Sequence, residues 1–257
     1  MRHVPRKRFS QNFLIDDRVI TDIVSAINPQ HNDLMIEIGP GLGALTGPLI
    51  AKLDHLHVIE IDRDIVARLK QTFPADRLTI HEGDALEFDF AALGPGLRVV
   101  GNLPYNISTP LLFHLARSGQ RIRDIHVMLQ KEVVDRMVAR PSTADYSRLS
   151  VMLQYRFQLD RVLDVPAAAF RPAPKVESAV VRLLPRPPEV ACDEALFAKL
   201  VMRAFAQRRK TLRNTLKGIF DVADFAALGL DPGARAETLA VADFARAANH
   251  LARKKAA

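Results

Sequence analysis

The sequence predicts an α/β fold with a largely parallel sheet, followed by a small helical domain. Short apolar runs alternate with helix-like segments as far as residue 185, which is typical of a parallel sheet covered by helices on both faces. A glycine-rich turn directly follows the first buried run. The run Pro185-Arg186-Pro187-Pro188 then stops helix and sheet hydrogen bonding, and the pattern beyond it is helical. We therefore expect one domain at 1–185 and a helical domain at 186–257.

The first strand and the turn after it predict a cofactor site. Leu34–Ile38 is a buried strand, Gly39-Pro40-Gly41-Leu42-Gly43 is the turn, and Ala44–Leu53 is a helix. Glycines at positions 39 and 41 let the backbone turn tightly and let a ligand approach the main chain. Ala44 replaces the last glycine of a dinucleotide fingerprint, and Pro40 lacks an amide that a pyrophosphate would bind. A nucleoside cofactor without a diphosphate is therefore favoured.

Acidic residues stand at the ends of the next two strands. The run Leu56–Asp62 contains Glu60, about 20 residues beyond the turn, which is the spacing at which a carboxylate reaches ribose hydroxyls. The run Leu78–Glu82 leads to Asp84, which we expect to accept a hydrogen bond from the adenine amine of the cofactor. These two acids follow consecutive strands, so they are predicted to meet at one edge of the sheet.

The segment Asn102-Leu103-Pro104-Tyr105 is predicted to hold a substrate amine. The Asn102 side-chain carbonyl and the Pro104 backbone carbonyl can accept both hydrogens of an exocyclic amine, while the Tyr105 ring offers a stacking surface for a base. Phe170 is expected on the opposite face of that base. The alternatives are an ordinary strand-to-helix turn for the segment and core packing for Phe170.

The other elements follow in order along the chain. A strand around Val99-Val100 is followed by a fifth strand at Asp124–Gln130 and by a helix at about Lys131–Ala139. A helix is predicted at Leu149–Tyr155. The runs Phe157–Val165 and Val176–Leu184 are predicted to form a closing antiparallel pair, which brings the sheet to seven strands. In the second domain, the first long helix is expected at about Glu194–Lys217.

The net charge of +7 is concentrated at the two ends of the chain. Residues 1–8 carry four basic and no acidic side chains, and residues 185–257 carry 13 basic and 8 acidic ones. Such a surface suits a polyanion, because each neutralised phosphate releases counterions. The alternative for the basic termini is that they only aid solubility. The alternative for the basic helix in the second domain is a solvated face. The candidate phosphate contacts are Arg6, Lys7, Arg8, Arg208, Arg209, Lys210 and Arg213.

Composition excludes several other kinds of site. Cys192 is the only cysteine, so an intrachain disulfide and a cysteine-cluster metal site are ruled out. The eight histidines show no paired spacing suggestive of a metal site, and we expect no metal. No apolar stretch reaches roughly 18 residues and no signal-peptide pattern follows the basic start. We expect a cytoplasmic monomer that does not engage a membrane.

Four segments in this order resemble the motifs of class I S-adenosylmethionine-dependent methyltransferases that modify adenine N6: Glu37–Gly43, Glu60, Gly83-Asp84 and Asn102–Tyr105. Three further segments resemble the ribosomal RNA adenine dimethyltransferases, most closely the bacterial small-subunit (16S) group whose loss confers kasugamycin resistance. These segments are Lys7–Leu14, Gly101–Ser108 and Phe170–Ser178. The resemblance covers nearly the whole chain.

The resemblance implies a Rossmann-like fold with a mostly parallel seven-stranded sheet and a small C-terminal helical domain. It implies S-adenosylmethionine as the cofactor, bound among Asn12, Leu14, Gly39, Glu60, Asp84 and Asn102. The implied activity is N6,N6-dimethylation of two adjacent adenosines near the 3′ end of 16S rRNA during small-subunit biogenesis. The implied partner is that RNA in a 30S assembly particle, with the basic residues as RNA contacts.

Three other functions remain as alternatives. A resistance-type 23S rRNA adenine methyltransferase shares the fold and the means of holding the amine. A non-catalytic ribosome assembly factor could use the same scaffold, although it would tolerate erosion of the Gly39 and Asn102 motifs, which are intact. A nicotinamide oxidoreductase is disfavoured by Ala44 and by the segment Asn102–Tyr105.

Overall fold

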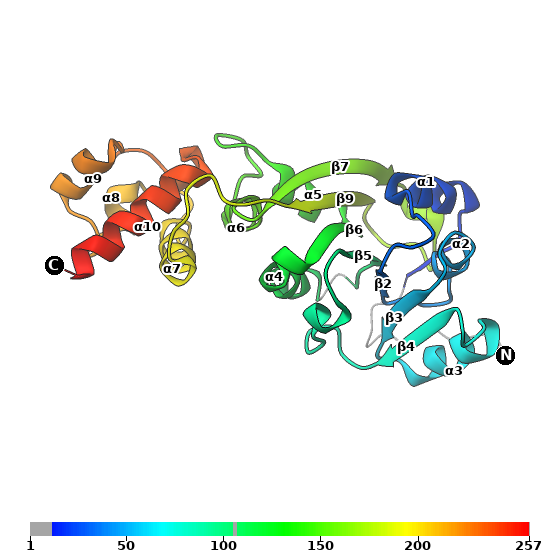
Figure 1. Ribbon diagram of the computed structural model, residues 1–257. Coiled ribbons are helices and arrows are strands. Elements are labelled where there is room, and N and C mark those ends of the chain that lie inside the picture. Colours follow the sequence, from blue (N-terminus) through cyan, green and yellow to red (C-terminus); the bar gives the residue numbers. More distant parts are fainter. Residues whose placement is uncertain (1–11, 105–106, 257) are drawn as a thin grey trace. The chain divides into compact units, whose positions relative to one another are not determined.

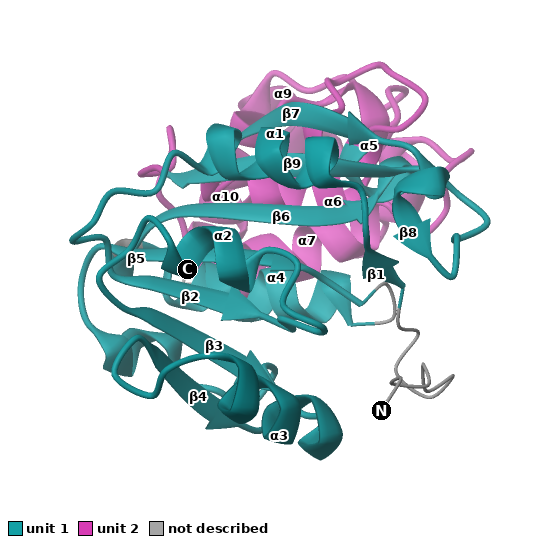
Figure 2. Cartoon of the chain, turned by 90° about the vertical axis from the view of Figure 1, so that its right-hand side faces the viewer, with its two compact units in different colours: residues 1–134, 159–185 teal, residues 135–158, 186–257 magenta. Residues whose placement is uncertain are grey.

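The computed structural model describes residues 12–104 and 107–256, and it divides into two compact units (Figures 1 and 2). The first unit comprises Met1–Val134 and Leu159–Pro185, and the second comprises Asp135–Gln158 and Arg186–Ala257. Within the described part of the chain, no helix is both long enough and apolar enough to cross a membrane.

The first unit is built on a seven-stranded sheet in the order β4-β3-β2-β5-β6-β9-β7. Strands β2 to β6 pair in parallel, and β9 runs antiparallel to β6. The predicted, mostly parallel seven-stranded sheet is thus confirmed. The strand bounds are β2 Met35–Ile38, β3 Leu56–Glu60, β4 Leu78–Glu82, β5 Leu97–Asn102, β6 Ile122–Gln130, β7 Phe157–Val165 and β9 Ser178–Pro185.

Helices cover both faces of this sheet. Figure 1 shows α1, α2 and α3 on one face and α4 on the other. Asp62 caps α3 by accepting a hydrogen bond from the Asp64 amide, so this helix begins three residues after β3 ends. That short connection fixes the end of β3, where the acid predicted to bind ribose lies. The helix bounds are α1 Asp17–Ile27, α2 Thr46–Ile50, α3 Arg63–Thr72, α4 Ser108–Arg117 and α5 Lys131–Val138.

A two-stranded sheet, which was not predicted from the sequence, joins the N-terminal segment to a distant loop. Strand β1 (Phe13–Leu14) pairs antiparallel with β8 (Phe170–Arg171), and the Ile15 amide donates to the Ala169 carbonyl at 2.8 Å. The pairing places Leu14 opposite Phe170, and both side chains enter the main apolar core, where Phe170 is only 3% exposed. Long-range pairing of two-residue strands leaves no periodic signal in the sequence.

The second unit packs its helices around a separate aromatic core. Tyr146, Val151 and Tyr155 from the segment 135–158 lie in this core with Phe197 and Phe244. The sequence predicts 135–158 as part of the first domain. In the structure its apolar side chains complete the helical core, and the segment lies in the second unit. The helix bounds are α6 Arg148–Gln154, α7 Glu194–Ala204, α8 Leu212–Thr215, α9 Val222–Leu228 and α10 Val241–Ala256.

The prediction of one helix over Glu194–Lys217 is wrong. The segment forms α7, a turn at 205–211 and the short α8. The Leu212 amide donates to the Ala234 carbonyl at 2.8 Å, and the Arg213 amide donates to the Pro232 carbonyl at 3.0 Å. In a continuous helix both amides would bond four residues back. Tertiary hydrogen bonds therefore replace the helical ones that local propensity favours.

A buried ion-pair cluster lies at the amino ends of β5 and β6. The Arg98 guanidinium donates to Asp124 at 3.0 Å, to Asp33, and to the carbonyls of Ile27 and Asn28. Burial opposes ionisation of Asp124, but hydrogen bonds and charge from His126 and Arg98 hold its pKa below the usual value. The arginine thus joins α1 and its following loop to the sheet.

We predict that Arg98→Met lowers the free energy of unfolding by about 3–5 kcal/mol, because two carboxylates lose their buried partner. Urea denaturation at pH 7 measures the loss. The matched control is Arg123→Met, because Arg123 bonds the same Asp33 at 3.0 Å with a side chain that is 60% exposed. That change should cost less than about 1 kcal/mol.

The Arg98 effect should also depend on pH. The folded-state pKa of Asp124 is lowered, so its pairing stabilises the fold above the unfolded value of 3.8 and is lost as the pH falls further. The difference between Arg98→Met and the wild type should therefore narrow below about pH 4. An equal difference at pH 3 and pH 7 would contradict the assignment of this stability to the pair.

Candidate active site

A cavity of about 370 Å³ lies at the carboxyl ends of β2, β3 and β5. The chain passes from β2 outward through β3 and β4 and then crosses to β5 on the other side of β2. Ligands bind at such reversals of strand order in open α/β sheets. The cavity brings together eight of the residues predicted from the sequence: Asn12, Leu14, Gly39, Gly41, Glu60, Asp84, Asn102 and Pro104.

The backbone after β2 turns in a way that favours glycine. Gly39 has φ +66° and Gly41 has φ +55°, both in the left-handed region. A third glycine, Gly101, permits a close approach of strands, since a Cβ there would stand 2.5 Å from the carbonyl oxygen of Ile38. The turn and the end of β5 can therefore border the same cavity.

Glu60 ends β3 with its carboxylate fixed by the backbone. Its Oε1 accepts hydrogen bonds from the amides of Ile61 and Asp62, both at 2.9 Å. Burial raises the pKa of Glu60, and the backbone amides of Asp62, Ile61 and Gly41 oppose that rise. A carboxylate held in this way is preorganised to accept hydrogen bonds from ribose hydroxyls.

Asp84 lies next to Glu60 because β4 pairs with β3. The Gly83 amide donates to the Glu60 carbonyl at 3.0 Å, and the Asp84 Oδ1 accepts from the Leu86 amide at 2.9 Å. These bonds bring the Asp84 carboxylate to the cavity as a hydrogen-bond acceptor. An acceptor there suits the amine of a cofactor adenine.

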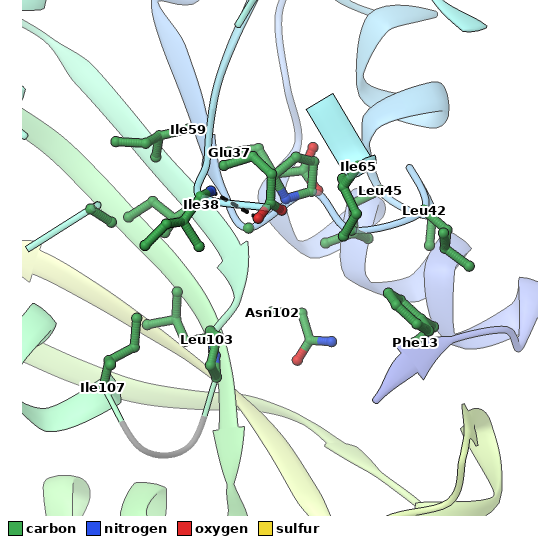
Figure 3. Close-up of a pocket in the computed structure, with 18 of the residues that line it drawn as sticks. Phe13, Glu37, Ile38, Leu42, Leu45, Ile59, Ile65, Asn102, Leu103 and Ile107 are labelled. Atoms are coloured by element: carbon green, nitrogen blue, oxygen red, sulfur yellow. Dashed lines mark hydrogen bonds between the residues drawn. The ribbon is translucent and has the colours of Figure 1, made fainter. Parts of the chain in front are cut away.

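Asn102 ends β5 and borders the other side of the cavity (Figure 3). Its Nδ2 donates to the Asn12 carbonyl at 3.3 Å, which orients the amide and leaves Oδ1 as the acceptor of the side chain. Pro104 follows in the lining. Tyr105, the predicted stacking residue, lies outside the described residues.

Phe170 is not among the residues that line the cavity. Its ring is buried in the core of the first unit beside Leu14. The expectation that this ring stacks on the substrate base stays a prediction, and in the structure the ring packs in the core. Pairing of β8 with β1 turns the side chain into the core, which is the packing alternative that the sequence left open.

Phe13, Glu37 and Ile61 also line the cavity, and none of the three was predicted as a site residue. Glu37 is 2% exposed and its Oε2 accepts a hydrogen bond from the Thr46 hydroxyl at 2.6 Å. Burial raises the pKa of Glu37 to about 7. The hydrogen bond from Thr46 lowers the pKa, and the nearby negative charge of Glu60 raises it further. An acid within an otherwise apolar strand before a glycine turn is the signal that could have identified it.

The lining fits a nucleoside cofactor that carries positive charge. Glu37, Glu60 and Asp84 are its only titratable side chains among the described residues, and the rest of the lining is apolar or uncharged. A pyrophosphate would be repelled by three acids and would find no amide donor at Pro40, so the cavity disfavours a diphosphate ligand. The described chain also holds no group of three His, Cys, Asp or Glu side chains that could bind a metal ion.

The predicted RNA contacts fall into three groups. Arg6, Lys7 and Arg8 lie outside the described residues. Arg209, Lys210 and Arg213 are exposed on the turn after α7 and on α8, within the second unit. Arg208 has a structural role as well, because its guanidinium donates to the Ala144 carbonyl and pairs with Glu237 at 3.6 Å.

The fold and this site together define a class I S-adenosylmethionine-dependent methyltransferase. The family model of ribosomal RNA adenine dimethylases matches residues 2–253, and the chain belongs to that family. It is therefore an enzyme that transfers methyl groups from S-adenosylmethionine to ribosomal RNA.

Curated relatives cover the full length of the chain. It is 66% identical over 253 residues to ribosomal RNA small subunit methyltransferase A of Chromobacterium violaceum. The match covers 97% of this chain and 97% of the relative. It is 64% identical over 252 residues to the protein of the same name from Thiobacillus denitrificans, which spans 97% of this chain and 99% of the relative.

Two solved structures share the fold. A dimethyladenosine transferase from Plasmodium falciparum matches 95% of this chain and 98% of its own, with a TM-score of 0.83 at 24% identity. The 23S rRNA methyltransferase ErmE matches 94% of this chain and 100% of its own, with a TM-score of 0.70 at 23% identity.

We predict that Glu60→Ala weakens S-adenosylmethionine binding by about 1.5–3 kcal/mol, the range for hydrogen bonds to a charged acceptor. Isothermal titration calorimetry measures the change. Glu82→Gln is the matched control, because Glu82 stands opposite Glu60 in the β3–β4 pairing but does not line the cavity. Unchanged affinity in a folded Glu60→Ala protein would remove this acid from the cofactor site.

Proposed function

We propose that this enzyme dimethylates N6 of two adjacent adenosines near the 3′ end of 16S rRNA in an assembling small subunit. It acts in the cytoplasm as a monomer. The observation that carries the proposal is the amide of Asn102, oriented by Asn12 at the edge of a cofactor cavity. The name shared by relatives that are 66% and 64% identical supports the small subunit as the target.

Asn102 and Pro104 supply what an adenine amine needs in order to react. The nitrogen is a poor nucleophile because its lone pair is delocalised into the ring. The Asn102 Oδ1 and the Pro104 carbonyl accept one hydrogen each and so favour tetrahedral geometry at nitrogen. Bound S-adenosylmethionine supplies the methyl group on a sulfonium. The two carbonyl dipoles then stabilise the positive charge that develops on N6, and the proton leaves afterwards.

The same arrangement permits a second transfer. An amine held by two carbonyl acceptors can be methylated once, rotate to present its remaining hydrogen, and react again where the pocket tolerates the first methyl group. The base must be unstacked to enter, and Tyr105 is the aromatic residue we assign to hold it. The basic side chains at 6–8 and 209–213 are the proposed grips on the RNA backbone.

Nucleoside analysis tests the substrate and the product. The protein is incubated with labelled cofactor and with small-subunit particles, large-subunit particles or naked RNA, and digested nucleosides are separated by mass spectrometry. We expect N6,N6-dimethyladenosine at two neighbouring positions of small-subunit RNA, with the particle preferred. Transfer to large-subunit RNA would favour the resistance-type alternative, and no transfer would favour a non-catalytic assembly factor.

We predict that Asn102→Ala lowers single-turnover methyl transfer by about 100-fold or more, the effect typical of losing one preorganised dipole at a developing charge. RNA affinity should stay within a few-fold of the wild-type value, because the proposed contact of this side chain is with the reacting amine and not with the RNA backbone. Filter binding and a labelled-methyl assay separate the two. A near wild-type rate would disprove the role of Asn102 in holding the amine.

We predict that Arg209→Gln combined with Lys210→Gln weakens RNA binding and flattens its salt dependence, by up to about 0.7–0.9 log units per lost phosphate contact. Arg208 is left intact because it holds two loops together. The charge-matched control is Arg253→Gln with Lys255→Gln, on exposed positions near the end of α10. An unaltered salt dependence would mean that Arg209 and Lys210 face solvent and do not contact the RNA phosphates.

A further inference from the structure

The cofactor cavity contains more acid than ribose and adenine require. Glu60 and Asp84 have assigned partners on the nucleoside. Glu37 has no assigned partner on the nucleoside, yet it lies in β2 and lines the same cavity. A buried carboxylate without a cationic partner is costly, so the third acid needs an explanation.

Glu37 and Glu60 lie in different environments although they come from adjacent strands. Three backbone amides stabilise the carboxylate of Glu60, whereas Glu37 has the single hydroxyl of Thr46. Burial is the largest influence on Glu37 and raises its pKa to about 7. Burial therefore favours the protonated form of Glu37 when the cavity holds no cation.

We propose that Glu37 exchanges a proton against the charge of the cofactor: it releases a proton when cationic S-adenosylmethionine enters and takes one back once the cofactor has become an uncharged thioether. In this role Glu37 is a positioning residue that distinguishes the cofactor before the reaction from the product after it. The inference depends on the cofactor alone and not on which RNA is methylated.

Charge and atoms balance over the cycle. Methyl transfer breaks the bond between sulfur and the methyl carbon, leaves the electron pair on sulfur and forms the bond to N6, which then loses one proton to solvent. The cofactor has lost one positive charge. Glu37 regains one proton from solvent, so the net charge within the cavity is restored.

The exchange favours departure of the product. With the sulfonium gone, an ionised Glu37 would be buried near Glu60 with one positive charge fewer in the cavity, which is unfavourable. Protonation removes that cost and, with it, the ionic attraction for the ligand.

The surroundings of Glu37 contain few other groups that could titrate with it. Strand β3 contributes Glu60 and the loop after β4 contributes Asp84, while α2, β5 and the described N-terminal segment contribute the uncharged Thr46, Asn102 and Asn12. Burial lowers the pKa values of the histidines at positions 57 and 81, which do not line the cavity.

Calorimetry of the full-length protein tests the proposal. S-adenosylmethionine and S-adenosylhomocysteine are titrated at pH 6.0, 6.5 and 7.0 in buffers of different ionisation enthalpy, which gives the number of protons released. This range stays below the α-amino pKa of about 7.7, so the ammonium group of both ligands stays mostly protonated. We expect more proton release with S-adenosylmethionine at pH 6 than at pH 7, and an affinity that rises several-fold between them.

The thioether should release no proton, and its affinity should change less than about twofold over the same range. Glu37→Gln should abolish the proton release and flatten the pH dependence for S-adenosylmethionine. Asp84→Asn is the matched control: it removes another carboxyl from the same lining and should weaken binding while proton release persists. Proton release that survives in Glu37→Gln, or equal release with both ligands, would overturn the proposal.

Thr46→Val gives an independent test that keeps Glu37 in place. Thr46 is fully buried, and valine preserves its shape while removing the hydroxyl that stabilises ionised Glu37. The midpoint of the pH dependence should shift upward, because the ionised form loses the hydroxyl donor that Thr46 supplies. A midpoint that does not move would also contradict the proposal, even if Glu37→Gln fails to fold.

Discussion

The close approach of β5 to β2 is the constraint on which the active site depends. A side chain at position 101 would collide with the carbonyl of Ile38, so this strand pair can form only with glycine there. The pairing then places Asn102 next to the glycine turn, while β3 on the other side of β2 delivers Glu60. The groups for substrate and cofactor are thus positioned by sheet hydrogen bonds, which hold them more tightly than loops could.

The same geometry creates an electrostatic problem, since carboxyl groups from neighbouring strands converge in one cavity. The structure stabilises them unequally. Glu60 lies where the backbone turns into α3 and receives amide hydrogen bonds, whereas Glu37 lies within a strand whose amides are committed to the sheet. Two chemically identical side chains therefore differ in their affinity for protons because of their position along the strand.

The sequence predicts those parts of the structure that local interactions determine, and it does not predict those that depend on contacts between distant segments. Periodicity of apolar residues located the strands of the sheet, and parallel strands end at one edge, so acids after consecutive strands were expected to meet. Glu60 and Asp84 do meet. Pairing of β1 with β8 and the membership of 135–158 in the second core arise from contacts between distant segments, and no local pattern encodes them.

The turn at 205–211 shows how a wrong local prediction changes a functional argument. Consecutive residues on a helix point about 100° apart, so a helix would spread Arg208, Arg209 and Lys210 around its circumference. Tertiary bonds from Leu212 end that regularity, and Arg208 fastens the turn to the Ala144 carbonyl. A turn anchored at both ends is free of helical spacing, so it can present Arg209 and Lys210 to the same stretch of RNA backbone.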